Sequence, residues 1–429
     1  MMHRWFIISM VMWVSGQACL AENWPAWRGP QGNGMSSERH LPIRWSPTNN
    51  VAWKLPLPGQ AGATPVVWEQ QIFLTSVDEQ NNLILMAVGT DGKEQWRRVI
   101  SSGNQRVRGD EGNYASPSPV TDGQHVWSLM GDGELACYTT TGQKVWQFNV
   151  QDRFGRLIIQ FGLTSTPVLH EGVLYLQLIH GDGDVKTREA CVVALDAATG
   201  KTRWRVDRPS DGYAENEHSY ASPVLYRDDQ RTFLLTHGAD YIVAHDLKDG
   251  KEIWRCGNLN RKENYDPTLR FVASPVCAPG IVVVPSAKRG PVLALKPTGR
   301  GDITHRPDYL LWELKRTPDV PSPLIVEDRV YLCMENGDLE IVRRDTGERL
   351  DYQRTERDRH RASPVYADGH VYLTSRGGKV TVVKVGDKVD IVAQNHLGED
   401  QSASPAISQG TIYLRTYQHL WAIRETHSE

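Results

Sequence analysis

The chain is poor in cysteine, and its cysteines show none of the spacings that carry redox or metal chemistry. Six cysteines are spread over 429 residues, with no adjacent pair, no Cys-x-x-Cys and no haem-attachment motif. We expect five of them to serve as small buried core residues, with one disulfide between two repeats as the alternative. These five are Cys137, Cys191, Cys256, Cys277 and Cys333.

The chain also lacks a large excess of charge of one sign and a long apolar run. Its 48 basic and 51 acidic residues give a formal net charge of −3, which offers no bulk attraction for nucleic acid. Its apolar stretch at residues 5–14 is too short to cross a bilayer, and no long stretch has helical periodicity. We therefore expect a mainly β protein with no nucleic-acid partner and no transmembrane span, and we expect it to be a monomer.

Residues 1–21 have the pattern of a bacterial-type secretory signal. Arg4 supplies a positive start, residues 5–14 are apolar, and small residues precede a cleavage site before Glu22. This pattern predicts export to the periplasm or cell envelope. A lipoprotein would be acylated at Cys19, but Gly16 stands where such sites usually have Leu or Val, so we favour export without a lipid anchor.

The most abundant pattern is Ser or Thr followed by Pro and a small apolar residue. Consecutive copies are 41 to 56 residues apart, which is the size of a four-stranded blade, so the chain is predicted to form an all-β, eight-bladed β-propeller of antiparallel blades over residues 51–425. The eight copies begin at Thr64, Ser118, Thr166, Ser222, Ser274, Ser322, Ser363 and Ser404.

Each copy continues with an alternating apolar strand, a glycine turn and, in most copies, a tryptophan. A tight hairpin turn favours glycine because the backbone adopts positive φ there. The tryptophan is expected on the outer strand, where its large ring would pack between adjacent blades. The tryptophans assigned to this structural role are Trp53, Trp96, Trp146, Trp204, Trp254 and Trp312.

The two ends of the chain predict how the ring closes. The eighth copy stops after residues 420–423 without an outer strand, and residues 51–57 form an additional strand before the first copy. Pairing these two segments would complete the last blade and leave no open seam. Residues 22–50 contain three tryptophans and several glycines, and we expect them to form a strap across one face or the channel mouth. Residues 426–429 are expected to be a short tail.

The blade pattern resembles the pyrroloquinoline quinone (PQQ)-like repeat. The sequence Ala-Leu-Asp-Ala-Ala-Thr-Gly-Lys leading to tryptophan, residues 194–204, carries this resemblance, which extends over about residues 51–425. The repeat is shared by quinoprotein dehydrogenases and the BamB-like lipoproteins of outer-membrane assembly. Residues 24–30, Trp-Pro-Ala-Trp-Arg-Gly-Pro, are similar to exported PQQ-like propellers of planctomycete-type bacteria, whose functions are largely unassigned.

The resemblance implies two different functions. Quinoprotein alcohol dehydrogenases use a calcium ion, a carboxylate base and a vicinal disulfide under the quinone, often with an attached haem domain. This chain lacks the Cys-Cys pair and the haem motif. We therefore expect no cofactor and assign no catalytic or metal-binding residue, which favours a BamB-like binding or scaffold module with an envelope protein or peptide partner. The alternative is a PQQ- and calcium-dependent oxidoreductase acting on alcohols or sugars in the channel.

Candidate ligand or partner residues lie in the segments before each Ser/Thr-Pro, because these segments converge at the channel mouth of a propeller. Such a set could hold a small polar ligand, a cation or a peptide, and His218 beside Glu217 could transfer protons. The alternative is that a wet channel mouth is polar in any large propeller. Residues 180–184 are interpreted as a hairpin turn and not as a calcium loop. The candidates are Asp110, Glu111, Asn113, Tyr114, Glu217, His218, Tyr220, Arg270, Asp319, Arg359, Arg361 and Asp400.

Overall fold

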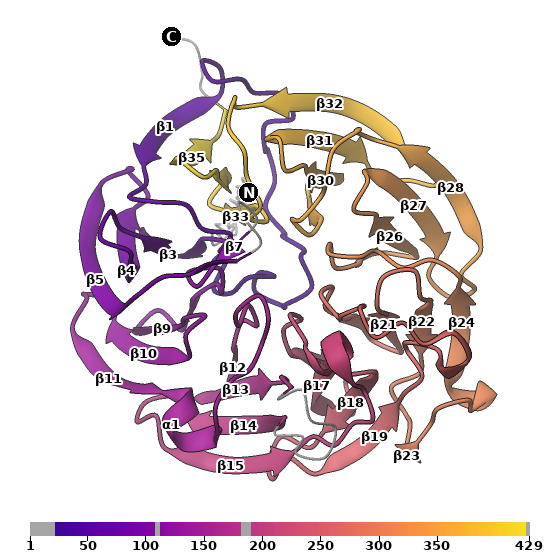
Figure 1. Ribbon diagram of the computed structural model, residues 1–429. Coiled ribbons are helices and arrows are strands. Elements are labelled where there is room, and N and C mark those ends of the chain that lie inside the picture. Colours follow the sequence, from indigo (N-terminus) through magenta and orange to yellow (C-terminus); the bar gives the residue numbers. More distant parts are fainter. Residues whose placement is uncertain (1–21, 108–111, 182–189, 426–429) are drawn as a thin grey trace, which may run out of the picture.

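The computed structural model describes residues 22–107, 112–181 and 190–425, which form eight antiparallel sheets arranged around a central axis (Figure 1). The predicted eight-bladed β-propeller is confirmed. The signal segment 1–21, the candidates Asp110 and Glu111, most of the 180–184 turn and the tail 426–429 lie outside the described residues.

The first four blades each follow the Ser/Thr-Pro pattern with strands in sequence order from the axis outward. Blade 1 contains β2 (Val66–Trp68), β3 (Gln71–Val77), β4 (Asn82–Gly89) and β5 (Glu94–Ser102). Blade 2 contains β8 (Val120–Thr121), β9 (His125–Leu129), β10 (Glu134–Thr139) and β11 (Lys144–Asn149). Blade 3 contains β12 (Val168–His170), β13 (Val173–Leu178), β14 (Cys191–Asp196) and β15 (Thr202–Asp207). Blade 4 contains β16 (Val224–Arg227), β17 (Thr232–Gly238), β18 (Tyr241–His245) and β19 (Glu252–Cys256).

The remaining four blades complete the ring. Blade 5 contains β20 (Val276–Ala278), β21 (Ile281–Pro285), β22 (Val292–Leu295) and β24 (Leu310–Leu314). Blade 6 contains β25 (Leu324–Val326), β26 (Arg329–Cys333), β27 (Asp338–Arg343) and β28 (Arg349–Arg354). Blade 7 contains β29 (Val365–Ala367), β30 (His370–Thr374), β31 (Lys379–Lys384) and β32 (Asp390–His396). Blade 8 contains β33 (Ala406–Ser408), β34 (Thr411–Arg415), β35 (His419–Ile423) and β1 (Val51–Pro56).

A few short elements connect or extend the blades. The short strand β23 pairs in parallel with β19 and so adds a fifth strand to blade 4. These elements are β6 (Arg106–Val107), β7 (Gly112–Asn113), α1 (Val150–Phe154), η1 (Ala214–Glu217), η2 (Lys262–Asn264), β23 (Gly301–Asp302) and η3 (Pro307–Tyr309).

The ring closes between the two ends of the chain, as the sequence predicts. Strand β1 pairs antiparallel with β35, with Val51 opposite Ile423 and Pro56 opposite His419. In Figure 1 the indigo β1 lies beside the yellow β35. The last blade is therefore built from both termini of the propeller, and no blade is left with three strands.

Tryptophans on the outer strands contact the hairpin turn of the next blade. The Trp96 ring lies against Gly142, and its Nε1–H donates to the Thr140 carbonyl at 2.9 Å. The same arrangement recurs at Trp53 with Gly92, Trp146 with Gly200, Trp204 with Gly250 and Trp312 with Gly347. Trp254 packs on Gly299, but its Nε1–H has no hydrogen-bond partner among the described residues.

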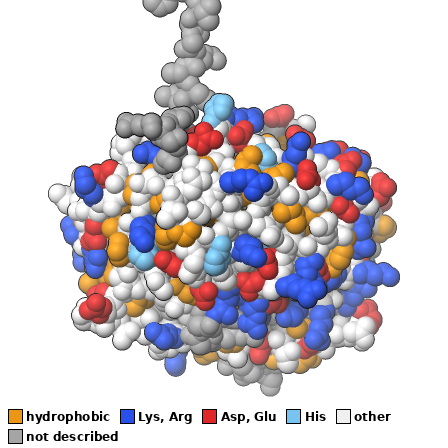
Figure 2. Space-filling model, turned by 90° about the horizontal axis from the view of Figure 1, so that it is seen from above, with side chains coloured by type: hydrophobic (Ala, Val, Ile, Leu, Met, Phe, Trp, Pro, Cys, Tyr) orange, Lys and Arg blue, Asp and Glu red, His pale blue; other side chains and the backbone are white. Residues whose placement is uncertain are grey.

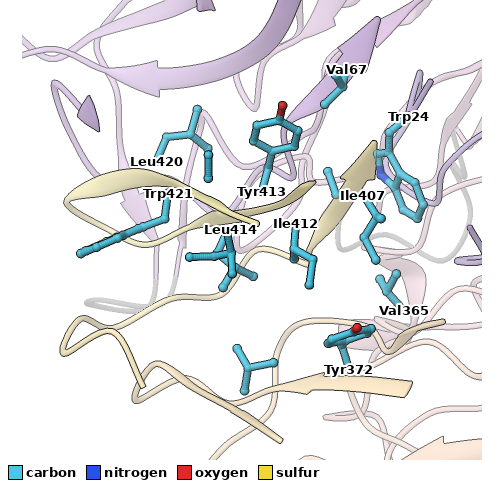
Figure 3. Close-up of a cluster of buried hydrophobic side chains, with 14 of the residues drawn as sticks. Trp24, Val67, Val365, Tyr372, Ile407, Ile412, Tyr413, Leu414, Leu420 and Trp421 are labelled. Atoms are coloured by element: carbon cyan, nitrogen blue, oxygen red, sulfur yellow. The ribbon is translucent and has the colours of Figure 1, made fainter. Parts of the chain in front are cut away.

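Residues 22–50 form a strap that crosses one face of the ring. Trp24 forms a β-bridge with Val67 of blade 1, and Met35 forms one with Tyr366 of blade 7. Trp24 is fully buried in an apolar cluster shared by blades 1, 7 and 8 (Figure 3). Between these two anchors, the buried Arg28 donates to the carbonyls of Pro323 and Pro364, both at 2.9 Å.

Acidic and basic side chains are interspersed over the rim in the view of Figure 2. No two of the five cysteines of the described residues form a disulfide, so the alternative of a disulfide between repeats is not formed among them. Burial raises the pKa of Cys137, Cys256 and Cys333 to about 12, which keeps these thiols protonated and poorly reactive.

Candidate binding site at the central channel

The repeated Ser/Thr-Pro links neighbouring blades around the channel. The backbone N–H of Ser118 donates to Thr166 Oγ1 at 3.2 Å, and the N–H of Thr166 donates to Ser222 Oγ at 2.9 Å. Equivalent bonds connect each successive copy from Thr64 to Ser404. The hydroxyl recurs in every copy because it accepts a hydrogen bond from a backbone N–H of the preceding blade, and this N–H has no partner within a strand ladder.

A cavity of about 240 Å³ lies on the axis inside this chain of hydrogen bonds. Its wall contains hydroxyl residues of the repeat and the residue two positions before each Ser or Thr. Every blade contributes one such residue. These are Gly62, Ser116, Thr164, Tyr220, Val272, Val320, Arg361 and Ser402. Trp27 of the strap also lines the cavity, and the strap crosses the face opposite the channel mouth.

Hydroxyl groups and two arginine side chains supply the polar part of the wall of this cavity. Each repeat hydroxyl in the wall accepts an amide hydrogen, so its own proton is left to donate. The Ser402 hydroxyl is buried and has no partner in the described parts of the chain. No carboxylate is among the lining residues that the structure describes. The cavity therefore suits a neutral polar or anionic group better than a cation.

Aromatic rings and two arginines surround the open mouth. The Arg270 guanidinium lies 4.4 Å from the centre of the Phe161 ring and pairs with Glu215. The Phe161 and Tyr220 rings are 6.0 Å apart, and Arg361 pairs with Glu335 at 3.0 Å. Glu215 and Glu335 do not line the cavity, so they hold the two guanidinium groups from behind.

Three of the residues predicted from the sequence therefore meet at the cavity: Tyr220, Arg270 and Arg361. Asp319 lies nearby in a charge network, 3.1 Å from Lys288, which also contacts Glu335 at 3.2 Å. Burial raises the pKa of the Asp319 carboxyl.

Four further candidates do not line the cavity. Asn113 donates to the Gln60 carbonyl at 2.6 Å and so braces a loop. The Tyr114 hydroxyl donates to Gln105 at 2.9 Å, and burial raises its pKa. Arg359 and Asp400 are exposed.

The pair proposed for proton transfer, Glu217 and His218, also lies outside the cavity. Glu217 is buried at the end of η1. Burial, assisted by His180 and Arg270, lowers the pKa of His218 to about 4. His218 is therefore neutral and weakly basic at neutral pH, which does not suit a general base.

Sequence reasoning missed most of the channel lining. It selected charged and aromatic residues near each Ser/Thr-Pro, whereas the lining position is fixed by its distance from the repeat. Counting two residues back from every Ser or Thr would have found Ser116, Thr164 and Ser402. No local signal marks Phe161 or Trp27, because each reaches the axis from a loop or from the strap.

The residues of the channel do not fit the calcium-bound quinone of the alternative function. Calcium is held by carboxylate and carbonyl oxygens, and the described lining offers no carboxylate. Within residues 22–107, 112–181 and 190–425, no group of three or more His, Cys, Asp or Glu side chains could hold a metal. The five cysteines of the described residues form no disulfide with one another that could lie under a cofactor.

The fold, the repeat and the channel define a PQQ-like repeat β-propeller. The family model described as "Outer membrane protein assembly factor BamB" matches residues 37–176 and 131–388. The chain belongs to this family.

Solved structures with the same fold include a BamB protein and two dehydrogenases. BamB from Moraxella catarrhalis is similar at 14% identity and a TM-score of 0.62, covering 87% of this chain and 99% of its own. A europium-containing methanol dehydrogenase is similar at 12% identity and a TM-score of 0.66, covering 94% and 90%. The quinohemoprotein alcohol dehydrogenase ADHIIG from Pseudomonas putida HK5 is similar at 12% identity and a TM-score of 0.64, and the match covers 95% of this chain and 82% of that one.

No curated protein sequence is similar to the chain. Among the described residues, no helix has the length and apolar composition needed to cross a bilayer.

Proposed function

We propose that this protein is an exported, BamB-like binding or scaffold module of the cell envelope, which acts without bound quinone. Its partner would be an envelope protein that inserts a loop or peptide segment into the open channel mouth. The proposal rests mainly on the composition of the cavity. Its described lining combines hydroxyl donors, aromatic rings and two arginines, but contains no acid–base pair.

The mouth has the residue types that give binding energy in protein interfaces. Aromatic and arginine side chains are enriched among residues whose removal costs more than about 1 kcal/mol of binding. Phe161 contacts both Tyr220 and Arg270, so the positions of these side chains are set before a partner arrives. Preorganised side chains lose less conformational entropy on binding.

Affinity capture from the native envelope with chemical cross-linking tests this proposal. The wild-type protein should recover a defined partner, and Tyr220→Ala or Phe161→Ala should reduce that recovery at least about tenfold, equal to about 1.4 kcal/mol. Tyr352→Ala provides the matched control, because Tyr352 is an exposed aromatic residue on the outer strand β28. Equal recovery with all variants would reject the channel mouth as the binding site.

Reconstitution with the quinone and calcium distinguishes the oxidoreductase alternative from the proposed binding function. The protein is incubated with PQQ and calcium, and dye reduction is followed over a panel of alcohols and sugars. We expect no turnover above that of heat-denatured protein. Turnover that Tyr220→Ala or Arg270→Ala abolishes would establish catalysis in the channel and overturn the proposal.

A further inference from the structure

The strap binds the ring by adding backbone to the innermost strands. The N–H of Trp24 donates to the Val67 carbonyl and the N–H of Val67 donates to the Trp24 carbonyl, both at 2.8 Å. Tyr366 instead takes part in a parallel bridge, in which its carbonyl accepts from the N–H of Ser36 and its N–H donates to the Gly34 carbonyl, both at 2.9 Å. The inner edges of β2 and β29 are thereby covered by an extended segment.

The residue that accepts the strap has the same position in each blade, two places after the proline. Val67 lies opposite Ile72 of its own blade, and Leu169 lies opposite Leu174 in the same register. Leu225 occupies this position in blade 4. Because hydrogen-bonded and non-bonded pairs alternate along an antiparallel ladder, the N–H and C=O of Leu169 and Leu225 point away from their own blades.

At Leu169 and Leu225 the edge of the innermost strand is not covered by the strap. The strap covers this position in blades 1, 2 and 7. In blade 2, the N–H of Thr121 donates to the Pro25 carbonyl of the strap at 3.0 Å. In the described chain no group hydrogen-bonds the backbone of Leu169 or Leu225 across this edge. An uncovered strand edge is a template for another extended segment.

A cavity of about 430 Å³ lies over these open edges, between the strap and blades 2 to 4. Leu169 and Leu225 line it, together with the half-buried rings of Trp27 and Trp68. Its volume falls within the range of about 300 to 1,000 Å³ that is usual for ligand pockets. Prolines give it stiff walls, and they are Pro25, Pro30, Pro167 and Pro223.

The charged side chains of the cavity wall, and the continuity of that wall with the strap, indicate which kind of ligand fits this cavity. Arg227, exposed at the end of β16, has His170 Nδ1 at 3.1 Å but no carboxylate partner among the described residues. The wall also carries two carboxylates: Asp122, which accepts from the backbone N–H groups of Gln124 and His125, and Glu171, which lies 3.8 Å from His170. An acidic side chain on an incoming segment would pair with Arg227. Trp27 and Arg28 belong both to the strap and to the cavity wall, so an added segment would continue the surface that the strap already makes.

We propose that this cavity binds an extended peptide segment of a partner protein, which adds to the innermost strands of blades 3 and 4 as the strap adds to blades 1 and 7. The segment presents backbone N–H and C=O groups to Leu169 and Leu225, an apolar side chain to Trp27 and Trp68, and an acidic residue to Arg227. Main-chain bonds supply affinity in this mode and side-chain pockets supply specificity. This site lies on the strap face and is separate from the channel mouth of the proposed function.

A labelled synthetic peptide with the sequence of residues 22–37 is a suitable probe, because this segment already adds to the repeated inner strand. Fluorescence anisotropy with the full chain should show saturable one-to-one binding. Leu169→Pro and Leu225→Pro should each weaken binding at least tenfold, because proline removes the outward N–H but no bond of the ladder. Cys277→Pro, the equivalent change on β20 outside the cavity, should bind as the wild type does.

A second measurement does not depend on the folding of the proline variants. The same peptide, N-methylated at the amides that correspond to Trp24 and Ser36, lacks the two N–H groups that the strap donates. It should bind the wild-type protein at least tenfold more weakly.

Several results would overturn the inference. The inference is wrong if the peptide does not bind, or if the methylated peptide binds as tightly as the unmodified one. It is also wrong if neither leucine substitution weakens binding, because the peptide would then be exchanging with the strap of the protein itself. A dimer that forms without peptide and is lost in Leu169→Pro would replace the partner with a second copy of this chain. Loss of peptide binding only in Tyr220→Ala would place the peptide at the channel mouth, which rejects this site and leaves the proposed function standing.

Discussion

At the scale of single residues, the hairpin glycines serve both the turn and the contact between blades. Gly142 has φ of 81°, and a Cβ at this position would lie 2.8 Å from the Trp96 ring. Any side chain would therefore strain the backbone and also push the indole away from the Thr140 carbonyl. Gly142 and Trp146 are four residues apart in the chain but take part in two different contacts, because each tryptophan meets the glycine of the next blade.

Gly142→Ala should lower the free energy of unfolding by about 2 to 4 kcal/mol, from backbone strain of about 1 kcal/mol and overpacking of about 1 to 3 kcal/mol. Urea denaturation measures the change. Gly280→Ala is the matched control, because Gly280 has φ of 85° and a Cβ added there would meet no atom within 4 Å, so only the backbone cost remains. Equal losses in the two variants would show that the tryptophan contact contributes nothing.

The candidate site was only partly predictable at this scale. Tyr220, Arg270 and Arg361 were identified because charged and aromatic residues precede the Ser/Thr-Pro, yet the same criterion also selected His218, which does not line the channel. The direction of a loop side chain depends on packing from other blades. The Arg270 contact with Phe161 joins residues more than one hundred positions apart, so no local pattern could reveal it.

At the scale of elements, the blades were predictable because the same pattern recurs eight times and each copy supports the interpretation of the others. Ring closure was predictable for the same reason, since one strand was missing at one end and one was extra at the other. The partners of the strap were not predictable, because residues 22–50 have no repeat. Their contacts with blades 1, 6 and 7 arise only once the ring exists.

Deletion of residues 51–57 should destabilise the whole ring. It removes the outer strand of blade 8 and the Trp53 contact with blade 1, so β35 becomes an open edge. We expect the free energy of unfolding to fall by several kcal/mol, which corresponds to a decrease in the midpoint of thermal unfolding on the order of 10 °C.

The control for this deletion restores the strand at the other end of the chain. Residues 51–57 are attached after Ile423 through a short glycine turn, as in the other blades. Recovery of the thermal midpoint would show that the strand and not its chain position is required. An unchanged midpoint in the deletion variant would refute closure by β1.

At the scale of the whole molecule, buried histidines link stability to pH. Burial lowers the pKa of His245 to about 4 and that of His237 to about 3. His245 Nδ1–H donates to the Gly250 carbonyl at 3.0 Å, and Thr236 Oγ1 lies 3.0 Å from its Nε2, which suits a neutral ring. The unfolded chain binds these protons near pH 6.5, so stability is complete above that pH and falls as the pH decreases toward the folded pKa.

His245→Gln should reduce this pH dependence. Each such histidine lowers the free energy of unfolding by about 1.4 kcal/mol per pH unit below pH 6.5, so the slope between pH 6.5 and 5 should decrease by about that amount. Urea denaturation at several pH values measures it. A slope identical in the variant and the wild type would contradict the assignment.

The joining of β1 to β35 also has a kinetic consequence. The ribosome makes β1 first among the strands of the ring and β35 last, so more than 360 residues of chain separate partners that must meet. Seven blades can form as they emerge, but the circle stays open until synthesis is nearly complete. A product that ends early retains an unpaired seam, which distinguishes unfinished chains from finished ones for any protease or chaperone that recognises exposed strands.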